Sequence, residues 1–271
     1  MFREDFIMTQ YKKFFTLSFD DGLEQDKLTL KMMRKYGIKG TFNLNSGLFG
    51  QKAYIKYMNK YGFSNAPKDA KKPIFGKFAD ADRIPVDEIR QVYEGMELAT
   101  HGVTHANLSK LSPEELRVEL LQDKEALQKF TDIPVVGHAF PFGRTSDSVE
   151  TFLKENDFLY ARGVTGEKAK RNFTFPDNPL NFKPTCWHIE DDIERLADQF
   201  IAAEPTNGDM LFYMWGHGYE FDFQSLKGLR DTYERIFDKI ASHDEIIKCT
   251  NAEAFLSQKE CYSSVPGQSP R

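Results

Sequence analysis

The sequence is poor in cysteine, and this scarcity excludes two classes of scaffold. Its 271 residues include three cysteines, Cys186, Cys249 and Cys261, which are odd in number and widely spaced. Such spacing is typical of neither a disulfide framework nor a cysteine-based zinc site. We therefore expect reduced thiols, as in a cytoplasmic protein.

Long apolar runs and an excess of basic charge are also missing. No apolar stretch approaches the roughly 20 residues of a membrane-spanning helix, and the mean hydropathy is −0.54. Lys and Arg number 36 against 41 Asp and Glu, and this net charge of −5 disfavours nucleic-acid binding. The first ten residues lack the apolar core of a secretory signal. We expect a cytoplasmic protein that binds neither membranes nor nucleic acid; export with a removed leader is the alternative.

Short apolar runs alternate with amphipathic stretches along most of the chain. The expected strands are 14–19, 40–44, 96–99, 135–140, 158–164, 210–215 and 245–249. The expected helices are 24–36, 85–93, 112–130, 193–203, 225–241 and a last one from Asn251. The helix start at Ser112 is well marked, because Pro113 and Glu115 follow at the first and third helical positions. Seven or eight strands alternating with helices predict an α/β barrel of parallel strands.

We expect the barrel to form one domain over residues 13–257. An N-terminal extension, 1–12, precedes it, and a flexible polar tail, 258–271, follows it. Residues 50–83 lack a clear periodic pattern of apolar residues and are interpreted as an insertion loop. Loops at a barrel mouth often shape a substrate site.

Two carboxylates, Asp20 and Asp21, stand where the first apolar run breaks into Gly22. At a strand end that turns at glycine, both side chains can face one cleft. Two close carboxylates resist joint ionisation unless a cation lies beside them. The alternative is an ordinary Asp-Gly turn with a solvated carboxylate.

Two histidines, His101 and His105, follow the strand expected at 96–99. Four residues apart, they would lie on one side of a helical turn, close enough to bind one metal ion. The alternative is a surface pair without a ligand.

Two further fragments follow strands. In Phe140-Pro141-Phe142-Gly143 a tight turn can present backbone N–H groups, although a plain connection is the alternative. His217 stands between two glycines after 210–215, where it could face a site or be structural. Catalytic groups of βα barrels gather at the C-terminal ends of strands, so all four fragments would converge. One acid and two histidines then form a metal triad, leaving an acid as base and a histidine as acid.

These fragments resemble the motifs of the polysaccharide deacetylase family, carbohydrate esterase family four. The family's T-F-D-D-G corresponds to Ser18–Gly22, and its H-[ST]-x-x-H to His101–His105, with Gly102 in the Ser/Thr place. Its R-x-P-Y corresponds to Ala139–Phe142, and L-x-L-x-H loosely to Phe212–His217. The resemblance covers about residues 13 to 257, and the first two motifs are its specific part.

The resemblance implies a distorted (β/α)7-type barrel with a divalent metal ion, most often Zn²⁺. By the same comparison Asp21, His101 and His105 are the metal ligands. Asp20 is then the general base, and His217 is the general acid. The backbone N–H of Phe142 would help to bind the oxyanion.

Two departures from the family pattern concern positioning residues. Ala139 replaces the arginine that holds the catalytic base in the family; Arg144 and Arg162 are candidates for its role. The family's Asp-Trp motif, which orients the acid histidine, has no clean match. Glu220 and the segment Cys186–Asp192 are the candidates, with surface or structural pairing as the alternative for Arg162 and Glu220.

Other polar and aromatic residues receive simpler interpretations. His138 is expected in the core or at the rim, His188 packed or exposed, and His243 at the surface. The candidates for stacking on a sugar are Phe142, Trp187, Trp215 and Tyr219, with core packing as the alternative for most of them.

The expected function is metal-dependent hydrolysis of acetyl groups from an N- or O-acetylated carbohydrate. One alternative is an amidohydrolase for a small cyclic amide, with or without metal. A second is a non-catalytic sugar-binding relative. The sequence leaves the oligomeric state open.

Overall fold

A computed structural model of this protein describes residues 11–52, 82–168, 171–222 and 228–263. Most of the expected N-terminal extension (1–12) and insertion loop (50–83) lies outside these ranges, as does the tail beyond residue 263. Residues 258–263 of the expected tail are helical. No helix in these ranges combines the length and apolar character needed to cross a membrane.

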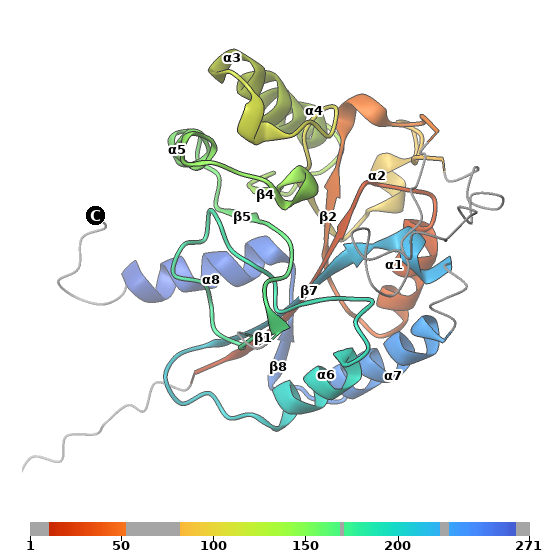
Figure 1. Cartoon of the computed structure of the whole chain (residues 1–271). Helices are drawn as coiled ribbons and strands as arrows, with labels where there is room; N and C mark the ends of the chain where they lie inside the picture. The colour runs from red at the N-terminus through yellow and green to blue at the C-terminus, as the bar shows by residue number, and fades with distance from the viewer. Residues whose placement is uncertain (1–10, 53–81, 169–170, 223–227, 264–271) are drawn as a thin grey trace, which may run out of the picture.

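The described chain contains eight strands, and all of them pair in parallel. They are β1 (Lys13–Asp20), β2 (Thr41–Leu44), β3 (Glu97–Thr100), β4 (Gly137–Ala139), β5 (Tyr160–Arg162), β6 (Cys186–Trp187), β7 (Met210–His217) and β8 (Ile246–Lys248). Their order is β5-β4-β3-β2-β1-β7-β6, with β8 also paired to β1. The sheet curls into a half-barrel with helices around it, which confirms the distorted (β/α)7-type barrel (Figure 1).

Strand β1 is the central strand of the sheet, and all eight of its residues are buried. It pairs with β7 along its whole length. On its other side it pairs with β8 near Lys13 and with β2 from Ser18 to Asp20. Phe15, Leu17 and Phe19 of this strand belong to an apolar cluster. The residues between them are polar but buried, and Thr16 donates to Asn251 while Ser18 accepts from Asn43.

Eight α-helices connect and cover the strands. They are α1 (Asp26–Lys35), α2 (Ile89–Val92), α3 (Pro113–Leu116), α4 (Asp123–Gln128), α5 (Asp147–Glu155), α6 (Ile193–Ala202), α7 (Leu229–Ala241) and α8 (Asn251–Ser263) within the described ranges. A π-helical segment, Arg117–Gln122, joins α3 to α4, so the expected helix 112–130 is one unit with wider turns at its centre. The sequence did not predict α5 or the two-residue strand β6.

The start of this helical unit is confirmed at Ser112. The Ser112 side chain accepts a hydrogen bond from the Glu115 N–H at 3.3 Å, and the Glu115 carboxylate accepts one from the Ser112 N–H at 2.7 Å. This capping box fixes where the helix begins.

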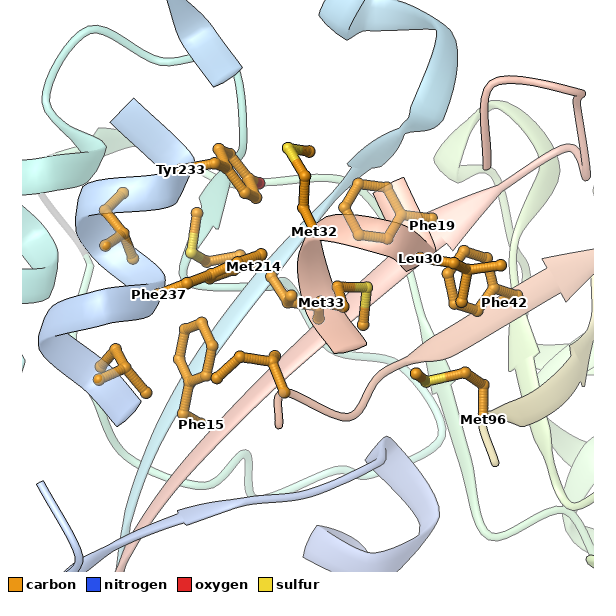
Figure 2. Packing of buried hydrophobic residues seen from close by; sticks show 14 of the residues in the cluster. Phe15, Phe19, Leu30, Met32, Met33, Phe42, Met96, Met214, Tyr233 and Phe237 are labelled. Atoms are coloured by element: carbon orange, nitrogen blue, oxygen red, sulfur yellow. The ribbon is translucent and has the colours of Figure 1, made fainter. Parts of the chain in front are cut away.

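The largest apolar cluster fills the space between the sheet and helices α1 and α7. Figure 2 shows Phe15 and Met214 of the sheet facing Phe237 of α7, with Met33 of α1 beside them. These side chains are all buried. This close packing on one face of the sheet holds β1 and β7 in place, and therefore fixes the positions of the residues at their C-terminal ends.

Candidate active site

The end of β1 places two carboxylates at the mouth of the half-barrel. Asp20, the last residue of the strand, lies in register with Asn43 of β2 and His217 of β7. Asp21 has a left-handed backbone with φ 79°, and Gly22 follows with φ 65°. This turn breaks the strand's alternation, so both carboxylates lie near the same imidazole, that of His101.

The predicted helical turn between His101 and His105 is wrong. Residues 101–107 form an irregular loop after β3, with φ 80° at Gly102 and φ 60° at His105. These left-handed residues reverse the chain, which a helical turn cannot do, and bring the two rings to a centroid distance of 4.7 Å. The pair therefore comes together as expected, but by a different backbone path.

Asp21, His101 and His105 offer ligand atoms that all lie within 4.8 Å of one another. The Asp21 Oδ1 atom is 3.8 Å from His101 Nε2 and 3.7 Å from His105 Nε2. The His101 Nδ1–H donates to the Ala139 carbonyl at 2.7 Å, because a carbonyl can only accept. This bond leaves the Nε2 lone pair directed to the site, as in histidines that ligate metals.

The protonation states of His105 and Asp21 also suit a cation. Burial and the neighbouring His101 lower the pKa of His105 to about 4, so its imidazole is neutral at pH 7. Burial alone would raise the pKa of Asp21, but the three imidazoles around it, together with Arg83, outweigh burial and lower it. A neutral imidazole and an ionised carboxylate are the forms that bind metal ions, so the three residues fit one divalent cation.

Asp20 has a different environment, a buried ion pair with Arg162. The Arg162 Nη2 group donates to Asp20 Oδ1, and its Nε–H donates to Ser18 Oγ at 3.2 Å. Asn43 donates to the same Asp20 oxygen at 2.8 Å. Arg162 and Asp20 are 1% and 3% exposed. The structure thus brings Arg162 to Asp20, from β5 instead of the third-motif position on β4.

His217 lies across the mouth from the paired imidazoles and contacts Glu220. Its Nε2 atom is 3.9 Å from Asp21 Oδ2, and its Nδ1 atom is 3.3 Å from Glu220 Oε1. Its backbone N–H donates to Glu220 Oε2 at 2.9 Å. The same carboxylate oxygen receives the Trp187 indole N–H at 3.2 Å and lies 2.5 Å from Nε2 of the buried His188.

The charges of this group favour a protonated His217. Burial opposes ionisation of Glu220, but His217 and His188 outweigh burial and lower the Glu220 pKa to about 2. Burial lowers the pKa of His217, whereas Glu220 and the two aspartates raise it, with a net value of about 9. A proton held on this imidazole is what a general acid requires.

Of the four aromatic candidates for substrate binding, Trp187 is partly buried, and the other three differ in exposure. Phe142 is 64% exposed, has φ 60° and makes a T-shaped contact with His105 at a ring-centroid distance of 4.6 Å. Trp215 and Tyr219 are 8% and 7% exposed. Trp215 stacks on Trp187, and Tyr219 stacks on His217. Of these three, Phe142 therefore offers by far the most ring surface to a ligand.

The remaining histidines lie as the sequence suggested, with one addition. His138 is fully buried and His243 is 39% exposed beside Glu245. His188 is packed, and its bond to Glu220 joins the two candidates for orienting His217, Glu220 and the segment Cys186–Asp192, in one group. Asn43 was missed, although a polar residue in the apolar run 40–44 is a usable signal.

The family model for polysaccharide deacetylase matches residues 8–161. A search of curated proteins gives no match.

Several solved structures resemble the chain at low identity. One from Mycobacterium smegmatis, assigned to the polysaccharide deacetylases, has 14% identity and a TM-score of 0.58, with 97% of this chain and 96% of that one covered. The Bc1960 peptidoglycan N-acetylglucosamine deacetylase has 16% identity and a TM-score of 0.52, with coverage of 91% and 90%. The polysaccharide deacetylase BC0361 from Bacillus cereus has 20% identity and a TM-score of 0.43, covering 61% of this chain. The match spans 44% of BC0361, less than half of its length.

Proposed function

Since the chain belongs to the polysaccharide deacetylase family, we propose that it is a metal-dependent hydrolase that removes acetyl groups from an acetylated carbohydrate. An N-acetylated sugar is the preferred substrate, and an O-acetylated one is the variant of the same chemistry. The proposal rests above all on one observation. The ligand atoms of Asp21, His101 and His105 lie within 4.8 Å of one another, with Asp20 and His217 both within 4 Å of the group.

In this proposal Asp21, His101 and His105 hold the divalent cation, and their nitrogen and oxygen donors suit Zn²⁺. A cation at this position would lower the pKa of a water molecule and polarise the acetyl carbonyl.

Asp20 acts as the general base and accepts a proton from the attacking water. Its bonds with Arg162 and Asn43 fix the direction of the carboxylate, while His101 Nε2 lies 3.9 Å from its other oxygen. A base fixed in this way needs little reorganisation when the substrate arrives.

His217 acts as the general acid and donates its proton to the leaving amine or alcohol. Glu220 holds the imidazole through its Nδ1 side and favours the protonated form. The Phe142 N–H donates to the oxyanion of the tetrahedral intermediate, an interaction worth about 3–4 kcal/mol for a well-placed donor. The exposed Phe142 ring can cover one face of the sugar.

The test is acetate release from N-acetylglucosamine oligomers, measured with and without a chelator. We expect release that the chelator abolishes and added Zn²⁺ restores. His217→Ala should lower kcat by about 10²–10⁴-fold with a smaller change in KM, since it removes a proton donor and not a binding contact. His243→Ala, a half-exposed histidine far from the cluster in sequence, is the matched control.

Two results would contradict the proposal. Metal-independent turnover of a small cyclic amide would favour the amidohydrolase alternative. Sugar binding without turnover of any acetylated compound would favour a non-catalytic relative.

A further inference from the structure

The ligand loop His101–His105 has no regular secondary structure of its own. Two of its residues, Gly102 and His105, have left-handed backbones. An irregular loop with two such residues is held in one conformation only by groups from outside it. These outside groups therefore decide how well the two imidazoles are placed for a cation.

Two carboxylates of the helical unit after the loop accept hydrogen bonds from two of its backbone N–H groups. The His101 N–H is shared between the Leu44 carbonyl of β2 and Asp123 Oδ2, at 3.0 Å from each. The Thr104 N–H donates to Glu119 Oε2 at 3.0 Å. The Thr104 hydroxyl donates to the other Glu119 oxygen at 2.6 Å. The second Asp123 oxygen accepts from the Ser46 N–H at 2.9 Å, which ties the loop after β2 to the same point.

The helical unit is shaped for this contact. Glu119 and Asp123 are 6% and 0% exposed, which is unusual for carboxylates. Glu119 lies in the π-helical segment Arg117–Gln122, and Asp123 follows directly after it. Segments of π-helix occur frequently at functional sites.

Gly102 shows that the carboxylate occupies the space of a missing side chain. A Cβ atom built on Gly102 would lie 2.8 Å from Glu119 Oε2.

We propose that Glu119 and Asp123 are positioning residues that hold the loop carrying His101 and His105 in the conformation that binds the cation. This inference rests on the metal site of the proposed function. In this proposal the two side chains hold the loop because they accept hydrogen bonds, and not because they are negatively charged.

The two carboxylates differ in how well the corresponding amide could keep their hydrogen bonds. Glu119 accepts one hydrogen bond from the Thr104 N–H and one from the Thr104 hydroxyl. A hydroxyl can also accept, so Glu119→Gln keeps both bonds, with the amide NH₂ group now donating to the Thr104 hydroxyl. Asp123 accepts two backbone N–H groups, which can only donate. Asp123→Asn must leave one of them facing an amide NH₂ group.

The test measures the Zn²⁺ dissociation constant of the folded protein by competition with a chromogenic chelator, well below the melting temperature. We expect Glu119→Ala and Asp123→Asn to weaken binding by about 10–100-fold, as for other groups that orient metal ligands. Glu119→Gln should bind like the wild type. Glu125→Ala, an exposed carboxylate of α4, is the matched control.

A second readout needs no metal. In the chelator-treated protein, hydrogen exchange of the Thr104 amide should be faster in Glu119→Ala than in the wild type, and near wild type in Glu119→Gln.

Each result decides between alternatives. A wild-type protein that binds no Zn²⁺ contradicts the proposed function itself. A wild type that binds, with Glu119→Ala binding equally well and exchanging no faster, overturns the positioning proposal alone. Equal weakening by Glu119→Gln and Glu119→Ala overturns it as well, because charge would then be the operative property.

Discussion

Arg162 is the residue that most clearly separates this site from the family pattern. It reaches Asp20 from β5, while the third-motif position on the neighbouring strand is the fully buried Ala139. The two residues lie in register, so the guanidinium enters the same region of the barrel from one strand further along. The Trp215 ring lies 4.9 Å from the guanidinium carbon and covers it.

Replacing Arg162 should be costly for the fold as well as for the chemistry. Arg162→Gln leaves the Asp20 carboxylate buried without its cation, so we expect the free energy of unfolding to fall by roughly 3–5 kcal/mol. Chemical denaturation measures this change. Arg195→Gln, which removes a 58% exposed partner of Asp192, should change it by less than about 1 kcal/mol. Similar losses in the two variants would contradict the assigned pairing.

His138 should make stability sensitive to mild acid. It is fully buried, and burial lowers its pKa well below the ordinary value of 6.5. The unfolded chain therefore takes up the proton first, and stability falls as the pH drops from 6.5 towards the folded-state pKa. The loss from this one group is at most about 1.4 kcal/mol per pH unit.

The measurement is the free energy of unfolding between about pH 7 and pH 5, for the wild type and for His138→Asn. The variant should lose stability less steeply over this interval, because its side chain does not titrate. Parallel curves would show that His138 does not contribute.

At the residue scale, the sequence identified the candidate metal ligands and catalytic residues, but not which side chains contact them. The doublet Asp20-Asp21 and the His101/His105 pair were found because both follow apolar runs. Arg162 was one of two candidates, since its partner is 142 residues away and no local pattern links them. Glu119 and Asp123 were not found, because acidic residues in an amphipathic helix ordinarily face water.

At the element scale, helix starts were predicted where the cap is local. The Ser112 capping box lies entirely within four residues, so its sequence signature is complete. The loop His101–His105 was predicted as a helical turn because spacing alone does not report left-handed residues. Strand β6 was missed because two residues are too few to show an alternation of apolar and polar side chains.

The capping box gives a prediction with a matched control in the same chain. Ser112→Ala removes the acceptor for the Glu115 N–H and should lower the free energy of unfolding by about 1 kcal/mol. Ser146→Ala changes another N-cap serine, at α5, whose side chain makes no capping bond. It should cost less, and equal costs in denaturation experiments would contradict the cap at Ser112.

Strand β7 has no room for a side chain at Gly216. A Cβ atom there would overlap the ring of His188, which holds Glu220. Gly216→Ala should therefore destabilise the protein by about 1–3 kcal/mol through overpacking and lower kcat through displacement of Glu220.

Gly163→Ala is the control, since its Cβ atom would meet other atoms only at 3.7 Å or more. Adding His188→Ala to Gly216→Ala should relieve the overlap, so the two substitutions should be non-additive in the melting temperature. Strictly additive effects would mean that the two residues do not press on each other.

At the scale of the whole molecule, parallel strands collect the chemistry at one edge. Asp20, His101 and His217 come from or directly after β1, β3 and β7, whose C-terminal ends lie on the same side of the sheet. The order of motifs along the chain was enough to predict this convergence, because it follows from a general rule for βα barrels. Which side chains then pair across the mouth depends on strand order and curl, and the sequence does not state these.

The central claim is that Asp21, His101 and His105 share one divalent cation. Anomalous X-ray diffraction from crystals soaked in Zn²⁺ tests it most directly. The account predicts one peak at about 2.0–2.2 Å from an Asp21 oxygen and from the Nε2 atoms of both histidines. No peak at this position, or a zinc ion bound there without Asp21, would contradict it.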